Sequence, residues 1–356
     1  MDTLTIVKPD DWHAHLRDGA MLEAVLPFIA ERFGRAIVMP NLSPDPVVTT
    51  EDLRAYRARI EATLGKNPHG FTPLMTYYLT ETSSPEMIAK GFTDGEVHAV
   101  KAYPANATTN SAQGVTDIKN VYPVLEAMQK VGMPILLHGE TVMRGGEEIP
   151  HPDREKVFLD TTLPMLLKDF PELKIVLEHA TTKDAVDFVM GEDSPRLGST
   201  LTAHHLLAST ADVAASEHPA YLKCMPVIKS ETDKASLRKA ATSGNEHFFL
   251  GTDSAPHPVS AKERANPAAG VYTGVGAMEL YAQVFDEEGK LENFEAFASL
   301  NGPRFYGLEP NAETVTLMRE PWTIDDVVHV SNGDTVRPFG YDEDPAKRLT
   351  LNWKLA

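Results

Sequence analysis

Cysteine is almost absent from this chain of 356 residues, which contains only Cys224. No intrachain disulfide can form, so the composition favours a reducing compartment, and we expect a cytoplasmic protein. No apolar run reaches the length of a membrane span, and the first residues lack the basic region and cleavage pattern of a signal peptide. The sequence therefore predicts no membrane partner.

Positive charge is also scarce, because 33 lysines and arginines face 51 aspartates and glutamates, for a net charge of −18. Such a balance argues against nucleic acid or an anionic membrane surface as a partner. It also sets a constraint on function. If the substrate is an anion, its site must concentrate positive charge from arginine, histidine or metal.

Short β-like runs alternate with helical stretches along the whole chain. Strands are expected at 4–7, 35–39, 71–79, 97–101, 134–137, 174–177, 198–203 and 248–250. Helices are expected at 21–33, 50–64, 84–90, 120–131, 154–168, 182–190, 234–242, 276–285 and 294–300. This alternation predicts an α/β fold, a (β/α)₈ TIM-type barrel, as one domain over 1–356 with a helical C-terminal extension from about 301 to 356. A doubly wound open sheet is the alternative.

Two histidines stand two residues apart just after the apolar run Leu4 to Val7, which we expect to be a buried strand. Side chains at i and i+2 of extended backbone point the same way, so His13 and His15 can reach one metal ion. Arg17 follows on the same side, where a metal-bound anion could meet it. With 13 histidines in the chain, close pairs also arise by chance, and the alternative is a pair of loop residues.

Further residues that suit a metal centre stand where later strands are expected to end, the edge at which a barrel gathers its site. They are Lys101, His138, His179 and Asp253. Each has a structural alternative: the histidines as core residues, Asp253 as a helix cap, and Lys101 as a surface lysine. All these alternatives would have to hold together, so the pattern favours a metal centre.

Lys101 needs a chemical change to take part. A lysine has a pKa near ~10.4, and its ammonium cannot bind a cation. Carboxylation by carbon dioxide would turn the side chain of Lys101 into an anion able to bridge two ions, which is a hypothesis that sequence alone does not test.

Seven stretches carry a specific resemblance to a known family: 11–19, 38–41, 101–111, 138–140, 178–185, 251–257 and 301–303. In this order and length, over nearly the whole chain, they resemble the dihydroorotases of the amidohydrolase superfamily, in the compact class of bacterial pyrimidine biosynthesis. The resemblance implies a zinc-dependent cyclic amidohydrolase. Its reaction would be the reversible hydrolysis of (S)-dihydroorotate to N-carbamoyl-L-aspartate, the third step of de novo UMP synthesis. It also implies a homodimer.

The resemblance implies two zinc ions per subunit, bridged by N6-carboxylated Lys101 and a hydroxide. The ligands of the more buried ion would be His13, His15, Lys101 and Asp253. The ligands of the other would be Lys101, His138 and His179. Asp253 would also be the catalytic residue, taking the proton of the hydroxide and passing it to the ring nitrogen.

The family's substrate contacts fall on the side chains of Arg17, Asn41 and His257, which would bind the carboxylate. The backbone at Met225 and Ala269 would hold the ring, together with the histidines His15 and His138. Thr108 and Thr109 resemble the mobile loop that closes over substrate. Each carboxylate contact has an alternative: Asn41 as a turn residue, Arg17 paired with Asp18 or Asp11, and His257 as part of a rigid loop.

The sequence departs from the family pattern in two places. The segment 141–153 is longer and more acidic than usual, and 262–270 lacks cysteines that many relatives carry, which leaves the register at Ala269 open. The remaining histidines, His204 and His205 among them, are interpreted as structural or exposed. Two other functions remain: a cyclic amidase such as a hydantoinase or allantoinase, which lacks the carboxylate clamp, and a non-catalytic barrel that binds a partner.

Overall fold

The computed structural model describes residues 2–192 and 194–356. Eight parallel strands form the central sheet in the order β11-β10-β9-β6-β5-β4-β3-β2. Their bounds are β2 Asp10–Ala14, β3 Arg35–Val38, β4 Thr72–Tyr78, β5 Ala99–Ala102, β6 Ile135–His138, β9 Ile175–Glu178, β10 Leu197–Leu201 and β11 Phe248–Leu250. Asp253 N donates to His13 O at 2.8 Å and His15 N donates to Ser254 O at 3.2 Å, so backbone hydrogen bonds join the two edges of the sheet. The predicted barrel is confirmed, and the open sheet is excluded.

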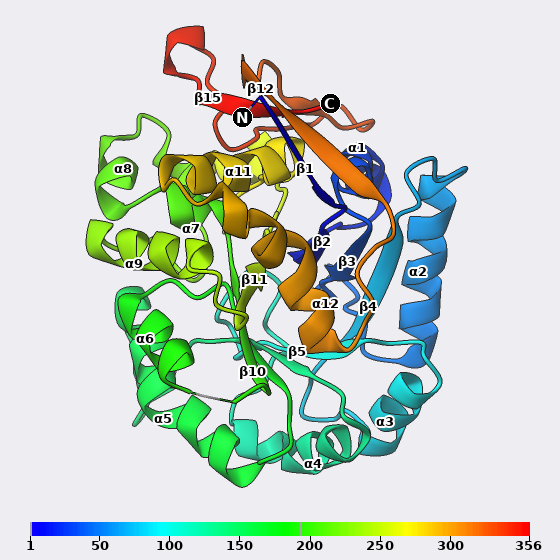
Figure 1. Ribbon diagram of the computed structural model, residues 1–356. Helices are drawn as coiled ribbons and strands as arrows, with labels where there is room; N and C mark the ends of the chain where they lie inside the picture. Colours follow the sequence, from blue (N-terminus) through cyan, green and yellow to red (C-terminus); the bar gives the residue numbers. More distant parts are fainter. Residues whose placement is uncertain (1, 193) are drawn as a thin grey trace.

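Helices surround the barrel and connect its strands (Figure 1). They are α1 Gly19–Arg32, α2 Thr50–Leu64, α3 Pro85–Thr93, α4 Tyr122–Val131, α5 Arg154–Asp169, α6 Lys183–Gly191, α7 Ala203–Leu207, α8 Thr210–Ala215, α9 Glu231–Thr242, α10 Val259–Lys262, α11 Ala277–Glu287 and α12 Asn301–Tyr306. Local signals set several of these bounds. The side chains of Thr49 and Asp52, for example, form a capping box at the start of α2, which satisfies backbone donors that the helix leaves open.

The prediction of the first barrel strand was wrong. The run Thr3–Val7 forms β1, in which only Ile6 is buried and which pairs antiparallel with β12 outside the barrel. The barrel strand is β2, whose five residues are all buried. The apolar residues of β1 led to the prediction of a buried strand there. The sequence of β2 is more polar, and its two buried carboxylates have partners elsewhere in the fold: Arg35 pairs with Asp10, and Thr252 donates to Asp11.

The prediction of a helical C-terminal extension was also wrong beyond α12. Residues 314–355 form strands: β12 Thr314–Thr323, β13 Val328–His329, β14 Thr335–Val336 and β15 Thr350–Leu355. In β15, Leu351 and Trp353 are buried and alternate with less buried residues, a period of two that suits a strand packed on one face. The sheet β1-β12-β15 lies over α11 and holds both chain ends close together (Figure 1).

A second apolar cluster fills the barrel interior, and α12 adds Phe305 to it. The Trp12 ring stacks on Tyr306 with centroids 4.3 Å apart. A side chain on Gly302 would collide with the Trp12 indole, which explains glycine at that position. This packed cluster supports the strands whose other ends carry the site. No helix among the described residues is long and apolar enough to cross a membrane.

Candidate metal centre and active site

The barrel brings the predicted metal ligands together at the carboxyl ends of its strands. His13 lies in β2 with His15 just beyond it, and Lys101 lies in β5. The remaining three come from β6 and from the residues that follow β9 and β11: His138, His179 and Asp253. Lys101 is fully buried, so the surface alternative for it was wrong. The β2–β3 register shifts between Asp11 and Ala14, an irregularity of the kind that redirects side chains beside active sites.

Three ligand atoms form a compact triangle. His13 Nε2 lies 3.4 Å from His15 Nε2, and Asp253 Oδ1 lies 3.2 Å and 3.1 Å from these two nitrogens. Two ligands of a tetrahedral zinc ion, each about 2.0–2.1 Å from the metal, are roughly 3.3 Å apart. The spacing and the nitrogen and oxygen donors therefore fit a zinc ion.

A second pair of nitrogens has the same spacing, because His138 Nδ1 lies 3.2 Å from His179 Nε2. The other nitrogen of His138, Nε2, lies 2.7 Å from Glu140 Oε2. A carboxylate accepts hydrogen bonds, so Glu140 fixes the proton of His138 on Nε2 and leaves Nδ1 free as a ligand. His179 Nδ1 is buried without a hydrogen-bond partner.

Lys101 contacts a carboxylate between the two groups of ligands. Its Nζ pairs with Glu178 Oε2 and lies 4.8 Å from the centre of the Tyr103 ring. Glu178 Oε1 lies 3.0 Å from His13 Nδ1, but neither atom has a hydrogen bond of good geometry. Burial lowers the pKa of Lys101 from 10.5 to about 7, so the neutral amine that reacts with carbon dioxide is accessible near neutral pH.

Burial also keeps the histidines in the form that binds metals. It lowers the pKa of His15 to about 3, and it lowers the pKa values of His13, His138 and His179 as well. Burial alone would raise the pKa of Asp253, but His13 and His15 outweigh it and hold that pKa well below its usual value. Neutral imidazoles and an ionised carboxylate are the states in which these groups bind a cation.

Backbone strain is concentrated here. Arg17, His179 and Asp253 have φ values of 59°, 42° and 44°, a region that residues other than glycine rarely adopt. Such conformations persist only where surrounding structure enforces them, and they cluster at functional sites. At His179, for example, the backbone N–H donates to the buried Thr200 hydroxyl at 2.8 Å.

Arg17 faces the site rather than a surface acid. Asp18 pairs with Arg59, whereas Arg17 Nε donates to Pro256 O at 3.1 Å. Arg17 Nη2 lies 3.1 Å from His257 Nε2, which itself lies 2.9 Å from Ala269 O. The Ala269 carbonyl only accepts and the Arg17 guanidinium only donates, so the tautomer of His257 decides which of the two contacts is a hydrogen bond. The Arg17 guanidinium is a donor that suits a carboxylate.

A small cavity of about 20 Å³ lies over the ligands. It is lined by His13, His15, Arg17, Asn41, Tyr103, Thr108, Thr109, His138, His179, Met225, Asp253, Ala255, Ala269 and Gly270. Among the predicted residues, Lys101 and His257 do not line this cavity. Arg17 is the one arginine or lysine among these lining residues, so positive charge is concentrated where an anion would enter.

The loop with Thr108 and Thr109 covers this cavity. Asn41 Nδ2 donates to Thr109 O at 3.1 Å, and the Thr109 hydroxyl donates to Ala269 O at 3.2 Å. Asn110 Nδ2 donates back to Asn41 O at 3.2 Å. Asn41 and Ala269, both predicted substrate contacts, are thus the residues on which the loop rests.

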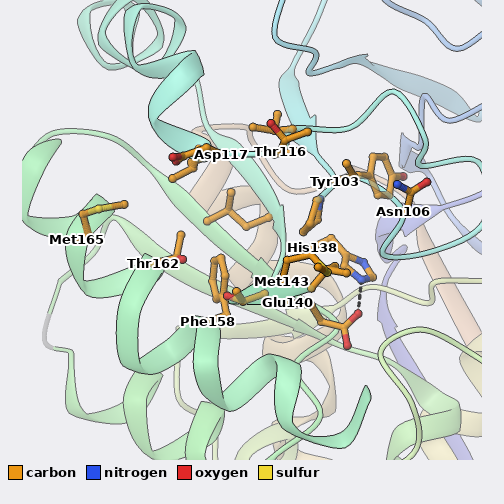
Figure 2. A pocket seen from close by; sticks show the side chains of 18 residues that line it. Tyr103, Asn106, Thr116, Asp117, His138, Glu140, Met143, Phe158, Thr162 and Met165 are labelled. Atoms are coloured by element: carbon orange, nitrogen blue, oxygen red, sulfur yellow. Dashed lines mark hydrogen bonds and ion pairs between the residues drawn. The ribbon is translucent and has the colours of Figure 1, made fainter. Parts of the chain in front are cut away.

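A larger cavity of about 470 Å³ lies beside the site, with His138, Glu140 and Tyr103 in its wall (Figure 2). The remaining wall is largely apolar, with Phe158 and Met165 from α5 (Figure 2). Its lining contains Asp117 and Glu140 and no lysine or arginine. Such a wall repels an anion, so the small cavity over the ligands is the candidate site.

In a further buried group, His204, His205 and Cys224, the last two have hydrogen-bond partners, whereas His204 Nδ1 has none among the described residues. His205 Nε2 lies 3.1 Å from Pro226 O and therefore carries a proton, while its Nδ1 lies 2.6 Å from the Thr202 hydroxyl. Cys224 Sγ donates to the same Pro226 carbonyl at 3.2 Å. The structural interpretation of His205 fits these contacts.

Sequence reasoning gave no role to several residues of the site. Glu140 and Glu178 contact predicted ligands. In the sequence, Glu178 directly precedes His179, and Glu140 stands two positions after His138. Asp11 accepts from Thr252 Oγ1 at 2.6 Å and from His13 N at 3.1 Å. The sequence shows that both glutamates stand close to a histidine. It does not show that Glu178 contacts Lys101 or that Asp11 contacts Thr252, because these partners are distant along the chain.

A model of the amidohydrolase family matches residues 5–322. A dihydroorotase of Cupriavidus taiwanensis is 53% identical over 354 residues, which cover 99% of this chain and 98% of that protein. Dihydroorotase from Saccharomyces cerevisiae in complex with 5-fluoroorotic acid is similar in structure, with a TM-score of 0.90 and 33% identity over 100% of this chain and 99% of that one. Dihydroorotase from Campylobacter jejuni gives a TM-score of 0.87 and 34% identity over 99% and 97%.

The barrel, the ligand cluster and the family match together show that the chain belongs to the amidohydrolase family. Within that family it belongs to the dihydroorotases, since relatives at about half identity span both chains almost completely.

Proposed function

We propose that the protein catalyses the reversible hydrolysis of (S)-dihydroorotate to N-carbamoyl-L-aspartate in pyrimidine biosynthesis, as a cytoplasmic homodimer. The observation that carries the proposal is the cavity in which Arg17 and Asn41 stand over the histidine–aspartate cluster. A hydantoinase or allantoinase would need the cluster but no clamp for a carboxylate.

The metal assignment follows from donor type and spacing. His13, His15 and Asp253 would hold one zinc ion, His138 and His179 a second, and carboxylated Lys101 would bridge them. Bound zinc would supply a nucleophile by lowering the pKa of water to about 7 and would polarise the ring carbonyl. Glu140 keeps Nδ1 of His138 available, and Glu178 accepts from the side chain of Lys101 in the uncarboxylated state.

Residues of the protein bind the substrate and transfer the proton. Arg17, Asn41 and His257 bind the substrate carboxylate, while the backbone at Met225 and Ala269, with His15 and His138, orients the ring. Asp253 takes a proton from the attacking water and delivers it to the departing ring nitrogen. An ionised carboxylate beside the reacting atoms suits this role.

Loop movement is part of the proposal. A cavity of about 20 Å³ holds about one water molecule, far less than a six-membered ring with its carboxylate. Thr108 and Thr109 must therefore withdraw for substrate to enter and can close again over it, excluding water.

We also propose that residues 1–356 form one domain. Leu317, Leu351 and Trp353 of the C-terminal sheet belong to the same core cluster as Tyr281 and Phe285 of α11. Few domain boundaries run through a shared core of this kind.

Arg17→Met tests the substrate assignment. Removing the charged donor from a buried carboxylate contact costs about 1.5–3 kcal/mol, so kcat/KM for dihydroorotate falls roughly 10- to 150-fold. The assay follows the ultraviolet absorbance of dihydroorotate, with and without zinc and bicarbonate. Arg59→Met, which removes the surface partner of Asp18, is the matched control, and its kcat/KM should stay near the wild-type value.

Undiminished turnover by Arg17→Met would assign the carboxylate to another residue. Wild-type protein without dihydroorotate hydrolysis, even after zinc is restored, would favour the non-catalytic alternative.

A further inference from the structure

Lys262, the last residue of α10, is buried and has no role in the proposed chemistry. Its Nζ donates to Gly270 O at 2.8 Å, to Ala268 O at 3.0 Å and to Lys223 O at 3.2 Å. An ammonium has three protons, so each finds one backbone acceptor. Burying such a charge is costly without full hydrogen bonding, which makes a purely space-filling role a poor explanation.

Two of the three carbonyls that accept from Lys262, those of Ala268 and Gly270, flank Ala269. The carbonyl of Ala269 itself lies 2.9 Å from His257 Nε2 and accepts from the Thr109 hydroxyl at 3.2 Å. The segment 268–270 is therefore held from two sides, by the lysine through its outer carbonyls and by His257 and Thr109 through its central one. Ala269 and Gly270 line the small cavity.

Lys262 also joins this segment to a second one. The Lys223 carbonyl accepts from Lys262 Nζ and from the Gly270 backbone N–H, the latter at 2.9 Å. Lys223 stands two residues before Met225, which lines the same cavity. One ammonium thus links the two stretches of backbone that face the proposed substrate ring.

We propose that Lys262 is a positioning residue that sets the spacing and orientation of the Met225 and Ala269 backbone, and through them the binding of the ring. The inference rests on the proposed function. Gly270 shows how tightly the segment is placed: its φ is +150°, and a side chain there would lie 2.7 Å from Ala255 O.

The test compares Lys262→Met with Lys8→Met in the full-length, zinc-loaded protein. Lys8 is another buried lysine, which donates to His69 O at 2.8 Å and to Ala30 O at 3.4 Å, outside the segments 223–226 and 268–270. Lys262→Met is expected to raise KM for dihydroorotate about tenfold or more, equivalent to at least two weakened backbone hydrogen bonds. Its kcat and its zinc content should stay within about threefold of wild type.

Lys8→Met controls for the general effect of removing a buried ammonium and should leave KM unchanged. An unchanged KM in folded Lys262→Met, or parallel changes in KM and kcat in both variants, would overturn the positioning role. If Lys262→Met does not fold, Lys262→Gln, which retains two donors, should give a smaller rise in KM, and no rise would overturn the proposal. Wild-type protein without turnover would instead defeat the proposed function, so the two failures are distinguishable.

Discussion

Two groups of buried histidines in this molecule resemble each other in composition and differ in what their nitrogens contact. In the metal-centre cluster (His13, His15, His138, His179 and Asp253), ligand atoms face one another at 3.1–3.4 Å. In the His204 cluster (His204, His205 and Cys224), a backbone carbonyl and a hydroxyl already occupy both nitrogens of His205. The ligand atoms of His204, His205 and Cys224 lie close enough together to hold one ion, and so do those of His13, His15 and Asp253. Burial and residue type are thus shared. The difference lies in His205, whose two ring nitrogens both have partners, whereas His204 Nδ1 has none among the described residues.

Substituting one member of each cluster should give the largest contrast. His138→Asn removes a proposed ligand and is expected to lower kcat/KM roughly 10³-fold, with loss of bound zinc. His205→Asn in the His204 cluster should retain the zinc content of wild type. Elemental analysis and the dihydroorotate assay measure both effects. Equal zinc loss in the two variants would remove the distinction between the clusters.

Glu140→Gln should have an intermediate effect, because Glu140 contacts a ligand rather than a metal. An amide can no longer accept at both positions, so the proton of His138 is less firmly held on Nε2, and zinc affinity should fall about 10- to 100-fold. Competition with a chelator measures that affinity. Glu148→Gln is the matched control. Glu148 lies in the exposed hairpin of β7 Met143–Arg144 and β8 Glu147–Glu148 and pairs with Arg154. An unaltered affinity in Glu140→Gln would mean that His138 keeps its tautomer without this contact.

The smallest effect is expected at Cys224 of the His204 cluster. Burial raises the pKa of its thiol from 9.0 to about 12, so the thiolate that reacts with alkylating reagents is nearly absent at pH 8. Native protein should therefore react with iodoacetamide far more slowly than unfolded protein. By linkage, the stability that Cys224 contributes is intact below pH 9 and declines as the pH rises from 9 towards 12, because only the unfolded thiol ionises there. Rapid labelling of the native protein at pH 8 would contradict this burial.

The sequence predicted most of the barrel and the proposed metal ligands, but it did not predict the first barrel strand or the role of Lys262. Ligands such as His138 and Asp253 stand where strands end, and strand ends can be located from apolar runs. The first barrel strand was missed because Asp10–Ala14 is rich in polar residues, whose partners come from distant parts of the chain. The same limit applies to Lys262, since its three acceptors are brought to it only by the folded loops 223–226 and 268–270.

In the proposed metal centre, carboxylation of Lys101 would decide whether one metal ion or two are bound. A crystal structure of the zinc- and bicarbonate-treated protein with anomalous scattering data tests this directly. The account predicts two anomalous peaks on either side of a carboxylated Lys101, one beside His13, His15 and Asp253 and the other beside His138 and His179. A single peak, or an unmodified Lys101 still paired with Glu178 at full zinc occupancy, would contradict it.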